Sequence, residues 1–521
     1  MLFLFQTAGL INVGDLQLIA PELILTVVAC VVLVMEVILP YKLSKWTAYF
    51  ALTGIALAMA SLGAQFVNMG GRLSLTALQN VTVLDGFYGM VRIDGFALVF
   101  KAIFLIAAAL AIAIAMRYLD IEREQHGEYY ALVLFATVGM MFLGSGYDLI
   151  SLYIALELMA VTFYVLVAFT KRQKRSNEAG MKYFLLGAFS SGILIYGMSL
   201  LYGVAGSTNL GDIGRSVATI SASSPMRPML LLGMIALAAG LFFKIAAVPF
   251  HMWAPDAYEG APTSVTAFLS TGSKAASFAL YARIFFVALA PMQIDWAPLL
   301  GIVAALTIVV GNWAAITQEN SKRLLAYSSI SNAGYLLLGI IANNLYGNIG
   351  LVIYLLVYVL MNMGAFGIII SLRRRGIIGD NVDDMTGLGQ KAPGMAAMMA
   401  IFMLSLGGLP GTGGFIGKYF LLWGLLQRGD ADHKSWYYWL AGWAVINIVV
   451  SFYYYIRFIK VMYLGDRVAD DQPLTMSPAL RTALVAALVG ILLIGIYPQP
   501  FILLAQKLIP AQAAASPLPP K

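Results

Sequence analysis

The chain of 521 residues has little charge, one cysteine and three histidines. A single cysteine, Cys30, allows no internal disulfide, and so few sulfur and imidazole groups offer no Cys/His metal cluster. Cys30 lies in an apolar run and is expected to be a small buried side chain. Charged residues make up 11% of the chain, whereas a soluble domain carries about a quarter. The surface therefore cannot be covered with charge, and water is not the main solvent.

Several sequence signals of soluble protein classes are missing. There is no P-loop, and no GxGxxG unit joins a strand to a helix, so the chain itself is not expected to bind nucleotides. The net charge of +7 comes without a basic patch interleaved with aromatic residues, which argues against nucleic-acid binding. The first residues lack a basic segment and a small-residue cleavage site, so no removable signal peptide is expected. Alternating ten-residue patterns, typical of membrane barrels, are also missing.

Long apolar runs are abundant instead, and the mean hydropathy is +0.84. Runs of about 20 residues can cross roughly 30 Å of hydrocarbon as helices. The sequence predicts an all-α polytopic membrane protein with about fourteen such helices. Their expected spans are 18–39, 46–67, 94–116, 130–147, 149–169, 183–204, 229–251, 262–287, 297–316, 324–342, 348–371, 394–424, 436–462 and 479–503.

The basic residues between these spans predict the orientation, because cytoplasmic loops carry more lysine and arginine. If both termini lie on one side, the opposite side holds 17 basic residues and the side of the termini holds 8. Both ends are therefore expected to face outward. The cytoplasmic set is Lys42, Lys45, Arg117, Arg123, Lys171, Arg172, Lys174, Arg175, Lys182, Lys322, Arg323, Arg373, Arg374, Arg375, Lys391, Lys460 and Arg467, and the outer set is Arg72, Arg92, Arg215, Arg227, Arg428, Lys434, Lys507 and Lys521.

Two segments interrupt the helical pattern, KIAAVPFHMWAPDAYEGAPTS after the seventh run and LGGLPGTGGFIGKYF in the twelfth. Proline and glycine free backbone groups there, and such groups are tolerated at membrane depth only where protein or water satisfies them. The breaks lie five helices apart, which predicts two inverted five-helix repeats with one broken helix each. The expected division is residues 1–128 (helices 1–3), 129–290 (first repeat), 291–465 (second repeat) and 466–521 (helix 14 and tail).

Four ionisable residues remain at depth: Glu157, Lys244, Lys274 and Lys418. A charge at the centre of a membrane helix costs about 2.5–3.5 kcal/mol or more, so such groups pair or line an ion path. One carboxylate and three lysines on separate helices predict a proton relay in which Glu157 controls the charge of Lys244. For His251 the sequence leaves two interpretations open, a proton step between lysines or a structural hydrogen bond at Pro249.

Other charged residues in the apolar runs have simpler interpretations. Lys101 is expected to reach the headgroup region, and Glu36 to be structural or interfacial. Glu22 would favour a helix N-terminus, and Arg283 would anchor a helix end. A metal site is not expected, because His126 and His433 lie in loops.

Four long segments resemble the antiporter-like membrane subunits of respiratory complex I, relatives of multisubunit cation/proton antiporter proteins. They are KRSNEAGMKYFLLGAFSSGILIYG, FKIAAVPFHMWAPDAYEGAPTSVTAFLSTGSKAASFA, NSKRLLAYSSISNAGYLLLG and LSLGGLPGTGGFIGKYFLL, and the resemblance covers about residues 15–505. The length, the PELIL start and Lys418 favour the N-type members, because an M-type chain is expected to carry glutamate at that place. An L-type chain would add a long lateral helix.

The resemblance implies fourteen helices with inverted repeats and a relay through Glu157, Lys244, Lys274 and Lys418. It implies proton translocation driven by NADH oxidation and quinone reduction in other subunits, at a bacterial inner membrane. No prosthetic group is expected in this chain, whereas NADH, FMN, iron–sulfur clusters and quinone would bind partner subunits. Expected partners are the neighbouring antiporter-like and small membrane subunits and the lateral helix of the L-type subunit. A subunit of a Na⁺(K⁺)/H⁺ antiporter, a non-conducting spacer, and a hydrogenase- or ferredoxin-linked module are the alternatives.

Overall fold

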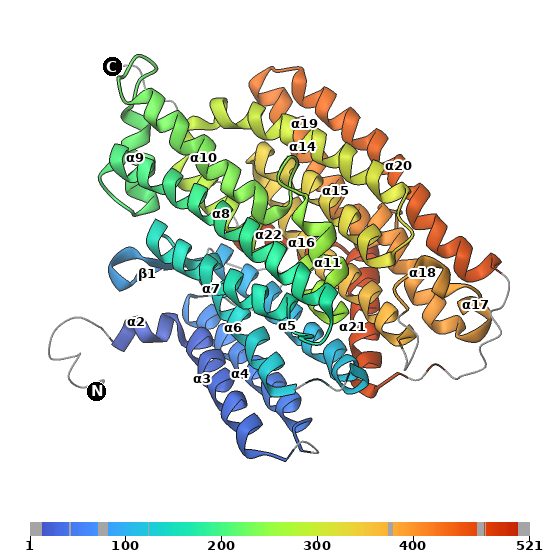
Figure 1. The fold of residues 1–521 in the computed structure, drawn as a ribbon. Helices are drawn as coiled ribbons and strands as arrows, with labels where there is room; N and C mark the ends of the chain where they lie inside the picture. The colour runs from blue at the N-terminus through green and yellow to red at the C-terminus, as the bar shows by residue number, and fades with distance from the viewer. Residues whose placement is uncertain are drawn as a thin grey trace.

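The computed structural model describes residues 13–508, apart from 41–42, 71–81, 123, 125, 374–378, 466–473 and 475. Within these ranges the fold is a bundle of long helices (Figure 1). Twelve helices of the described chain are long and apolar enough to cross a membrane. They are α3 (Ala20–Ile38), α4 (Trp46–Asn68), α5 (Gly95–Glu122), α6 (His126–Ser145), α7 (Leu149–Val167), α8 (Lys174–Ala205), α10 (Arg227–Ile245), α14 (Gln293–Ile316), α15 (Ser321–Ala342), α16 (Leu345–Leu372), α20 (Trp436–Leu464) and α21 (Pro478–Ile496).

Two further segments match the remaining expected spans, and both are interrupted. The eighth span consists of α12 (Thr263–Phe268), a π-helical turn (Leu269–Ser273), α13 (Lys274–Arg283) and a second π-helical turn (Ile284–Ala288). The twelfth consists of α18 (Pro393–Gly407) and α19 (Gly413–Asp432). Together with the twelve uninterrupted helices they correspond to the fourteen expected spans. The all-α polytopic class predicted from hydropathy is confirmed.

Short elements connect the long helices. They are α2 (Val13–Leu18), β1 (Leu84–Gly86), β2 (Val91–Ile93), α9 (Leu210–Thr219), α11 (Trp253–Gly260), α17 (Leu388–Lys391) and α22 (Gln499–Leu508), with 3₁₀ turns at Phe87–Gly89, Ala290–Met292 and Val382–Met385. Strands β1 and β2 form an antiparallel hairpin, with Asp85 opposite Arg92. The hairpin was not expected from hydropathy, because each strand has only three residues. The last expected span, 479–503, divides into α21 and α22.

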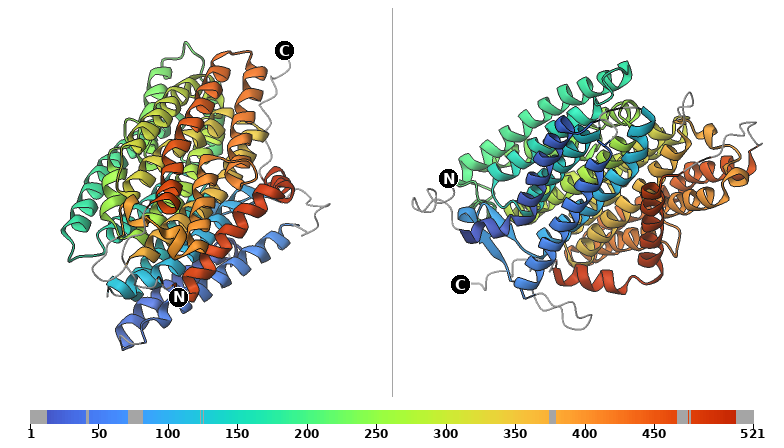
Figure 2. Two further views of the ribbon diagram at one scale, coloured as in Figure 1. Left: turned by 90° about the vertical axis from the view of Figure 1, so that its right-hand side faces the viewer. Right: turned by 90° about the horizontal axis from the view of Figure 1, so that it is seen from below.

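The helices are arranged by burial. Helices α15 and α16 are buried almost throughout, whereas α3, α4, α8, α20 and α21 leave a broad apolar face exposed. The N-terminal helices α3 and α4 form one edge of the bundle, and the view from below brings them to the front (Figure 2). Exposed apolar faces on a membrane bundle contact hydrocarbon, so the outer surface is as apolar as the interior. Many of the buried polar side chains belong to α15 and α16.

Close packing of α8 on α10 depends on small residues. A Cβ atom added at Gly197 would lie 2.5 Å from the backbone nitrogen of Leu237, and one at Gly240 would lie 2.7 Å from Cβ of Leu194. No side chain fits at such a separation, so only glycine lets the two backbones approach. This contact fixes the position of Lys244, which lies one turn after Gly240 on α10.

The N-terminal helices correct two expectations. Lys101 does not reach a headgroup: it is 0% exposed, and its Nζ lies 2.6 Å from Oε1 of Glu22, itself 1% exposed. Glu22 is in the first turn of α3, as expected, but its partner is a lysine of α5. Cys30 is exposed and not buried, because it lies on the outer face of α3 beside Val27 and Val31.

Two other charged residues have the structural roles that were expected. Glu36 accepts hydrogen bonds from Ser44 Oγ at 2.6 Å and from the backbone nitrogen of Gly127 at 2.9 Å. The anchoring role of Arg283 takes the form of a bidentate ion pair with Asp94, at 2.7 Å for both bonds. Burial alone would raise the pKa of Asp94, but the Arg283 guanidinium outweighs it and holds that pKa below its usual value.

Some residues used for the orientation lie outside the described ranges. They are Lys42, Arg72, Arg123, Arg374, Arg375, Arg467 and Lys521. The start of the chain, on which the signal-peptide expectation rests, is also outside them.

Candidate functional site

Glu157 and Lys244 lie on either side of α8. Glu157, on α7, is partly buried, and its Oε1 accepts a hydrogen bond from Ser191 Oγ of α8 at 2.5 Å. The neighbouring Ser190 donates to the backbone oxygen of Gly240 on α10 at 3.1 Å. Lys244 is buried, and its Nζ has no hydrogen-bond partner among the described residues. The Glu157 carboxylate is near enough to attract the Lys244 ammonium without contacting it.

The first expected break follows Lys244 directly. Ala246 takes a left-handed conformation (φ 57°, ψ 43°), which ends α10. The freed backbone groups find partners: Trp253 Nε1 donates to the oxygen of Phe243 at 2.9 Å, and the nitrogen of Val248 donates to Thr307 Oγ1 at 3.0 Å. Unwound backbone at membrane depth is stable only with such partners. Both the existence and the place of this break agree with the sequence.

His251 lies in the turn between α10 and α11. It is partly buried, and its Nδ1 has no hydrogen-bond partner among the described residues. A backbone hydrogen bond with Pro249 acts on the imidazole, so the structural interpretation of His251 stays open beside the proton-transfer one. The imidazole is placed just after the break, seven residues beyond Lys244.

The far end of the first break is bound by the start of α15. Arg323 contacts Asp256 at 3.1 Å and Glu259 at 2.8 Å, both on α11. Lys322, which is buried, donates to the backbone oxygen of Ala261 at 3.0 Å. We call Lys322 and Arg323 together the cationic clasp. A surface cavity of about 170 Å³ opens beside it and is lined by Arg175, Glu178, Ala179, Lys182, Asp256, Glu259 and Gly260. Lys322 and Arg323, which were expected only to indicate the membrane orientation, thus bind the segment that follows the first break.

Lys274 opens α13, directly after the π-helical turn Leu269–Ser273. Its Nζ donates to both the backbone oxygen and Oγ of Ser329 on α15, each at 2.5 Å. The same nitrogen lies 5.9 Å from the centre of the Tyr358 ring. A π-helical turn adds a residue to the helix and is common at functional sites, because it re-aims the following side chains. Here it precedes Lys274, whose hydrogen-bond partner lies on the buried helix α15.

Lys418 lies beyond the second break and turns back to it. Its Nζ donates to the backbone oxygens of Leu406 at 2.7 Å and Gly407 at 3.2 Å. These are the last carbonyls of α18, where Gly408 (φ 92°) ends the helix. Carbonyls at a helix C-terminus carry partial negative charge and favour a cation. Lys418 therefore follows its break and caps it, whereas Lys244 precedes its own. The two halves are not equivalent in this respect.

The sequence interpretation missed a polar cluster between these lysines, formed by Ser328 and Asn332 of α15, Tyr354 of α16 and Tyr455 of α20. Tyr354 donates to Asn332 Oδ1 at 2.6 Å, and Ser328 Oγ lies 2.5 Å from the Tyr455 hydroxyl. All four are buried. The signal was present in the stretch AYSSISNAGY, which places several hydroxyl and amide side chains in a membrane helix. Attention to charge alone passed over it.

None of the hydrogen bonds or ion pairs of the described residues joins two members of the expected relay directly. Lys244, Lys274 and Lys418 are all buried, Glu157 and His251 partly so, and each lies on a different element. Among the described residues, no group of three or more His, Cys, Asp or Glu side chains is placed to hold a metal ion. The five residues therefore occupy separate positions in the bundle.

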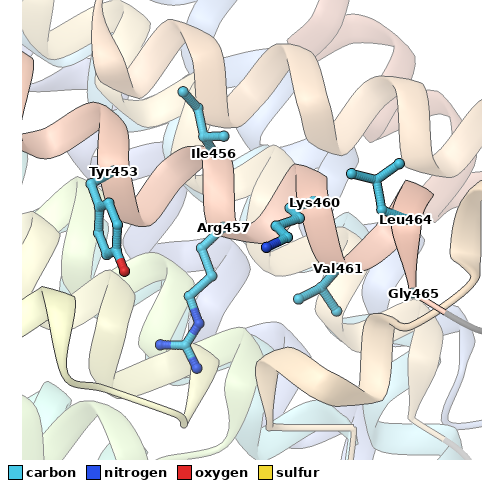
Figure 3. A pocket seen from close by; sticks show the side chains of 7 residues that line it. All are labelled: Tyr453, Ile456, Arg457, Lys460, Val461, Leu464 and Gly465. Carbon is cyan, nitrogen blue, oxygen red and sulfur yellow. The ribbon is translucent and has the colours of Figure 1, made fainter.

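A larger surface cavity of about 520 Å³ lies elsewhere, on the outer face of α20 (Figure 3). It is lined by Tyr453, Ile456, Arg457, Lys460, Val461, Leu464 and Gly465, and no relay residue contributes to it. Tyr453 faces this cavity, whereas the following Tyr454 and Tyr455 are buried. Helix α20 thus has a surface side and an interior side, and only the interior side touches the polar cluster.

Comparison with known proteins agrees with this geometry. The family model described as "NADH:quinone oxidoreductase/Mrp antiporter, TM" matches residues 146–445. "NADH-quinone oxidoreductase subunit N 2" of Solibacter usitatus is 48% identical over 496 residues, which are 95% of this chain and 97% of that protein. A chain of respiratory complex I from Thermus thermophilus with bound aureothin is 33% identical, with a TM-score of 0.75 over 93% of this chain and 99% of its own.

A chain of the Mrp complex from Dietzia sp. DQ12-45-1b shares the fold, with a TM-score of 0.75 over 95% of this chain and 97% of its own. Its identity is only 19%, so the likeness concerns the fold alone. The family model and the close relative together decide the membership: this chain belongs to the NADH:quinone oxidoreductase/Mrp antiporter membrane family, among the N subunits of NADH-quinone oxidoreductase.

Proposed function

We propose that the chain moves protons across the membrane as the antiporter-like N subunit of a proton-translocating NADH–quinone oxidoreductase. The observation that carries the proposal is the burial of three lysines on separate helices around two backbone breaks, with one carboxylate beside the first. A charge at such depth is costly, and a structural role would be served by a paired charge, as at Glu22 and Lys101. Lys244, Lys274 and Lys418 have no acidic partner in contact among the described residues.

In the proposed path a cytoplasmic proton loads at Lys244 under the influence of Glu157. It then passes to Lys274, held by Ser329, and on to Lys418 and an outward exit. Opposite charges 4 Å apart interact by about 4 kcal/mol at an effective dielectric constant of 20. Moving one proton against 100 mV requires about 2.3 kcal/mol. Rearrangement of one such pair is therefore large enough to drive a proton step.

The proposal includes the two inverted repeats, residues 129–290 and 291–465, and outward-facing termini. Support for the repeats comes from the two breaks, which end α10 and α18 through left-handed residues. Support for the orientation comes from the excess of basic residues in the loops opposite the termini. His251, next to the first break, is proposed as an auxiliary proton group. The chain lies in a bacterial inner membrane in this proposal.

The expected partners are the other membrane subunits of the complex, including the lateral helix of the L-type subunit. NADH, FMN, iron–sulfur clusters and quinone would bind partner subunits, where the redox chemistry takes place. The chain itself is proposed to carry no prosthetic group, and its part is to bind protons at the three lysines, Glu157 and His251. Charge changes in neighbouring subunits would reach the relay first at Glu157, which lies on α7.

The test measures proton uptake by inside-out vesicles containing the assembled complex with Lys244→Ala, Lys274→Ala or Lys418→Ala. We expect a severalfold lower uptake per NADH oxidised, with unchanged NADH oxidation by an artificial acceptor. The matched control is the double variant Glu22→Leu with Lys101→Met, which removes a buried lysine outside the path. Normal pumping by all three lysine variants would refute the proposal and favour a spacer that conducts no protons.

A Na⁺(K⁺)/H⁺ antiporter subunit is the second candidate, because the Dietzia Mrp chain has the same fold. In the same vesicles, proton movement that requires an opposing gradient of Na⁺ or K⁺, with no NADH, would favour it. Proton uptake driven by NADH in the absence of both cations would exclude it.

A further inference from the structure

The polar cluster adjoins the surroundings of two relay lysines, Lys274 and Lys418. Ser328 of the cluster precedes Ser329, whose oxygens hold Lys274 at 2.5 Å. On the other side, Tyr354 packs against Gly417, the residue before Lys418. A Cβ atom at Gly417 would lie 2.6 Å from the Tyr354 ring and 2.8 Å from its Cα. The cluster therefore adjoins the surroundings of both lysines that the proposed path must connect.

Three of its four side chains can relay a proton. A serine or tyrosine hydroxyl both donates and accepts, so it can receive a proton on one side and release one on the other. Ser328 and Tyr455 form one such pair at 2.5 Å, and Tyr354 supplies a third hydroxyl. An amide differs, because its nitrogen only donates and its oxygen only accepts at physiological pH. A chain of hydroxyls that meets an amide is interrupted there.

Asn332 stands at this point of interruption. It accepts from Tyr354 at 2.6 Å, and its Nδ2 faces Ser328 Oγ at 3.4 Å and the Tyr455 hydroxyl at 3.5 Å. The Tyr354 proton is thereby directed onto an atom that cannot pass it on. Exchanging the amide oxygen and nitrogen would alter the donors but not this conclusion, since neither amide atom relays a proton.

We propose that Asn332 is a positioning residue that blocks proton transfer between Tyr354 and the Ser328–Tyr455 pair. This inference rests on the proposed function. Protons would cross from Lys274 to Lys418 only when the Tyr354 hydroxyl leaves Asn332. Such a block is useful in a pump, because an uninterrupted chain between its sites would let protons flow back when no redox reaction drives them.

A purely structural role for the amide would leave different geometry. A buried amide usually finds partners for both its donor and its acceptor. Asn332 makes one short bond, to Tyr354, and its donor contacts lie at or near the upper limit for a hydrogen bond. The Ser328–Tyr455 pair is meanwhile satisfied without it. The strong contact of the amide is thus the one that holds the tyrosine hydroxyl.

The test compares variants of Asn332 in the assembled complex in sealed vesicles. Passive proton influx is driven by a potassium diffusion potential, without NADH. Asn332→Asp and Asn332→Ser introduce groups that relay protons, and we expect severalfold faster influx with a lower proton yield per NADH. Asn332→Leu introduces none, so its influx should match that of the unaltered complex. Asn447→Asp is the matched control, since the hydrogen bonds of this buried amide among the described residues go to Asn312 and to Trp443 of its own helix, and none goes to a member of the cluster.

Several results would overturn the inference. Influx through the Asp and Ser variants that equals the control would do so. Equal leaks in the Ser and Leu variants would also do so, because the amide would then only fill space. If no Asn332 variant assembles, Tyr354→Phe decides: we expect reduced pumping without a leak, and normal pumping rejects the block. Normal pumping by Lys244→Ala, Lys274→Ala and Lys418→Ala together would instead reject the proposed function itself.

Discussion

The buried pair of Glu22 and Lys101 predicts a large loss of stability when one partner is removed and a much smaller loss when both are replaced by apolar residues. In Glu22→Gln the Lys101 ammonium loses its one ion-pair partner among the described residues, at 0% exposure. Leaving one half of a buried pair costs about 3–5 kcal/mol.

In Lys101→Met the Glu22 carboxylate is left alone at 1% exposure, so a loss of the same size, about 3–5 kcal/mol, is expected. The double variant Glu22→Leu with Lys101→Met should regain most of the stability lost in the single variants, because neither charge is then left alone.

The measurement is equilibrium unfolding of the purified full chain in mixed micelles, followed by circular dichroism. No loss of stability in either single variant would refute the argument that the pair is shielded from water.

Two further predictions concern the relay. Gly417→Ala should separate α19 from α16, because the new Cβ would lie within 2.8 Å of Tyr354, and it should therefore lower pumping. Gly442→Ala, whose Cβ would have nothing within 4 Å, should leave pumping unchanged in the same assay. Ser191→Ala removes the hydrogen bond to Glu157, which contributes about 1.5–3 kcal/mol for a charged acceptor. This variant should slow proton uptake more than Ser199→Ala, which lies on the exposed side of α8. Equal rates of uptake in the two variants would contradict a role for Glu157.

Hydropathy predicted the number and order of the membrane spans because each span must satisfy its own backbone, whatever its neighbours are. The two breaks were predictable for the same reason, since proline and glycine act on the backbone where they stand. The burial of Lys244, Lys274 and Lys418 also followed from local sequence. The interaction partners of the charged residues could not be predicted from the sequence. The contact of Lys101 with Glu22 joins α5 to α3, and nothing near Lys101 in the sequence distinguishes it from a lysine that reaches a headgroup.

The polar cluster was harder to predict for a related reason. Neutral residues such as Asn332 and Tyr354 are common in membrane helices, so their importance depends on contacts among α15, α16 and α20. Cys30 shows the same limit in reverse, because an apolar run does not reveal which face of its helix looks outward. Charged residues and the helix-breaking residues proline and glycine are local signals, whereas a hydrogen-bonded network is a property of three-dimensional packing.

The cationic clasp at the start of α15 has a mechanical consequence. Lys322 binds the end of the first break, and Ser329, seven residues later, binds Lys274. Seven residues are two turns, about 10 Å, so both contacts lie on one face of a single helix. A helix moves as a stiff rod over such a length. A displacement of α11 would therefore be transmitted along α15 to the contact between Ser329 and Lys274.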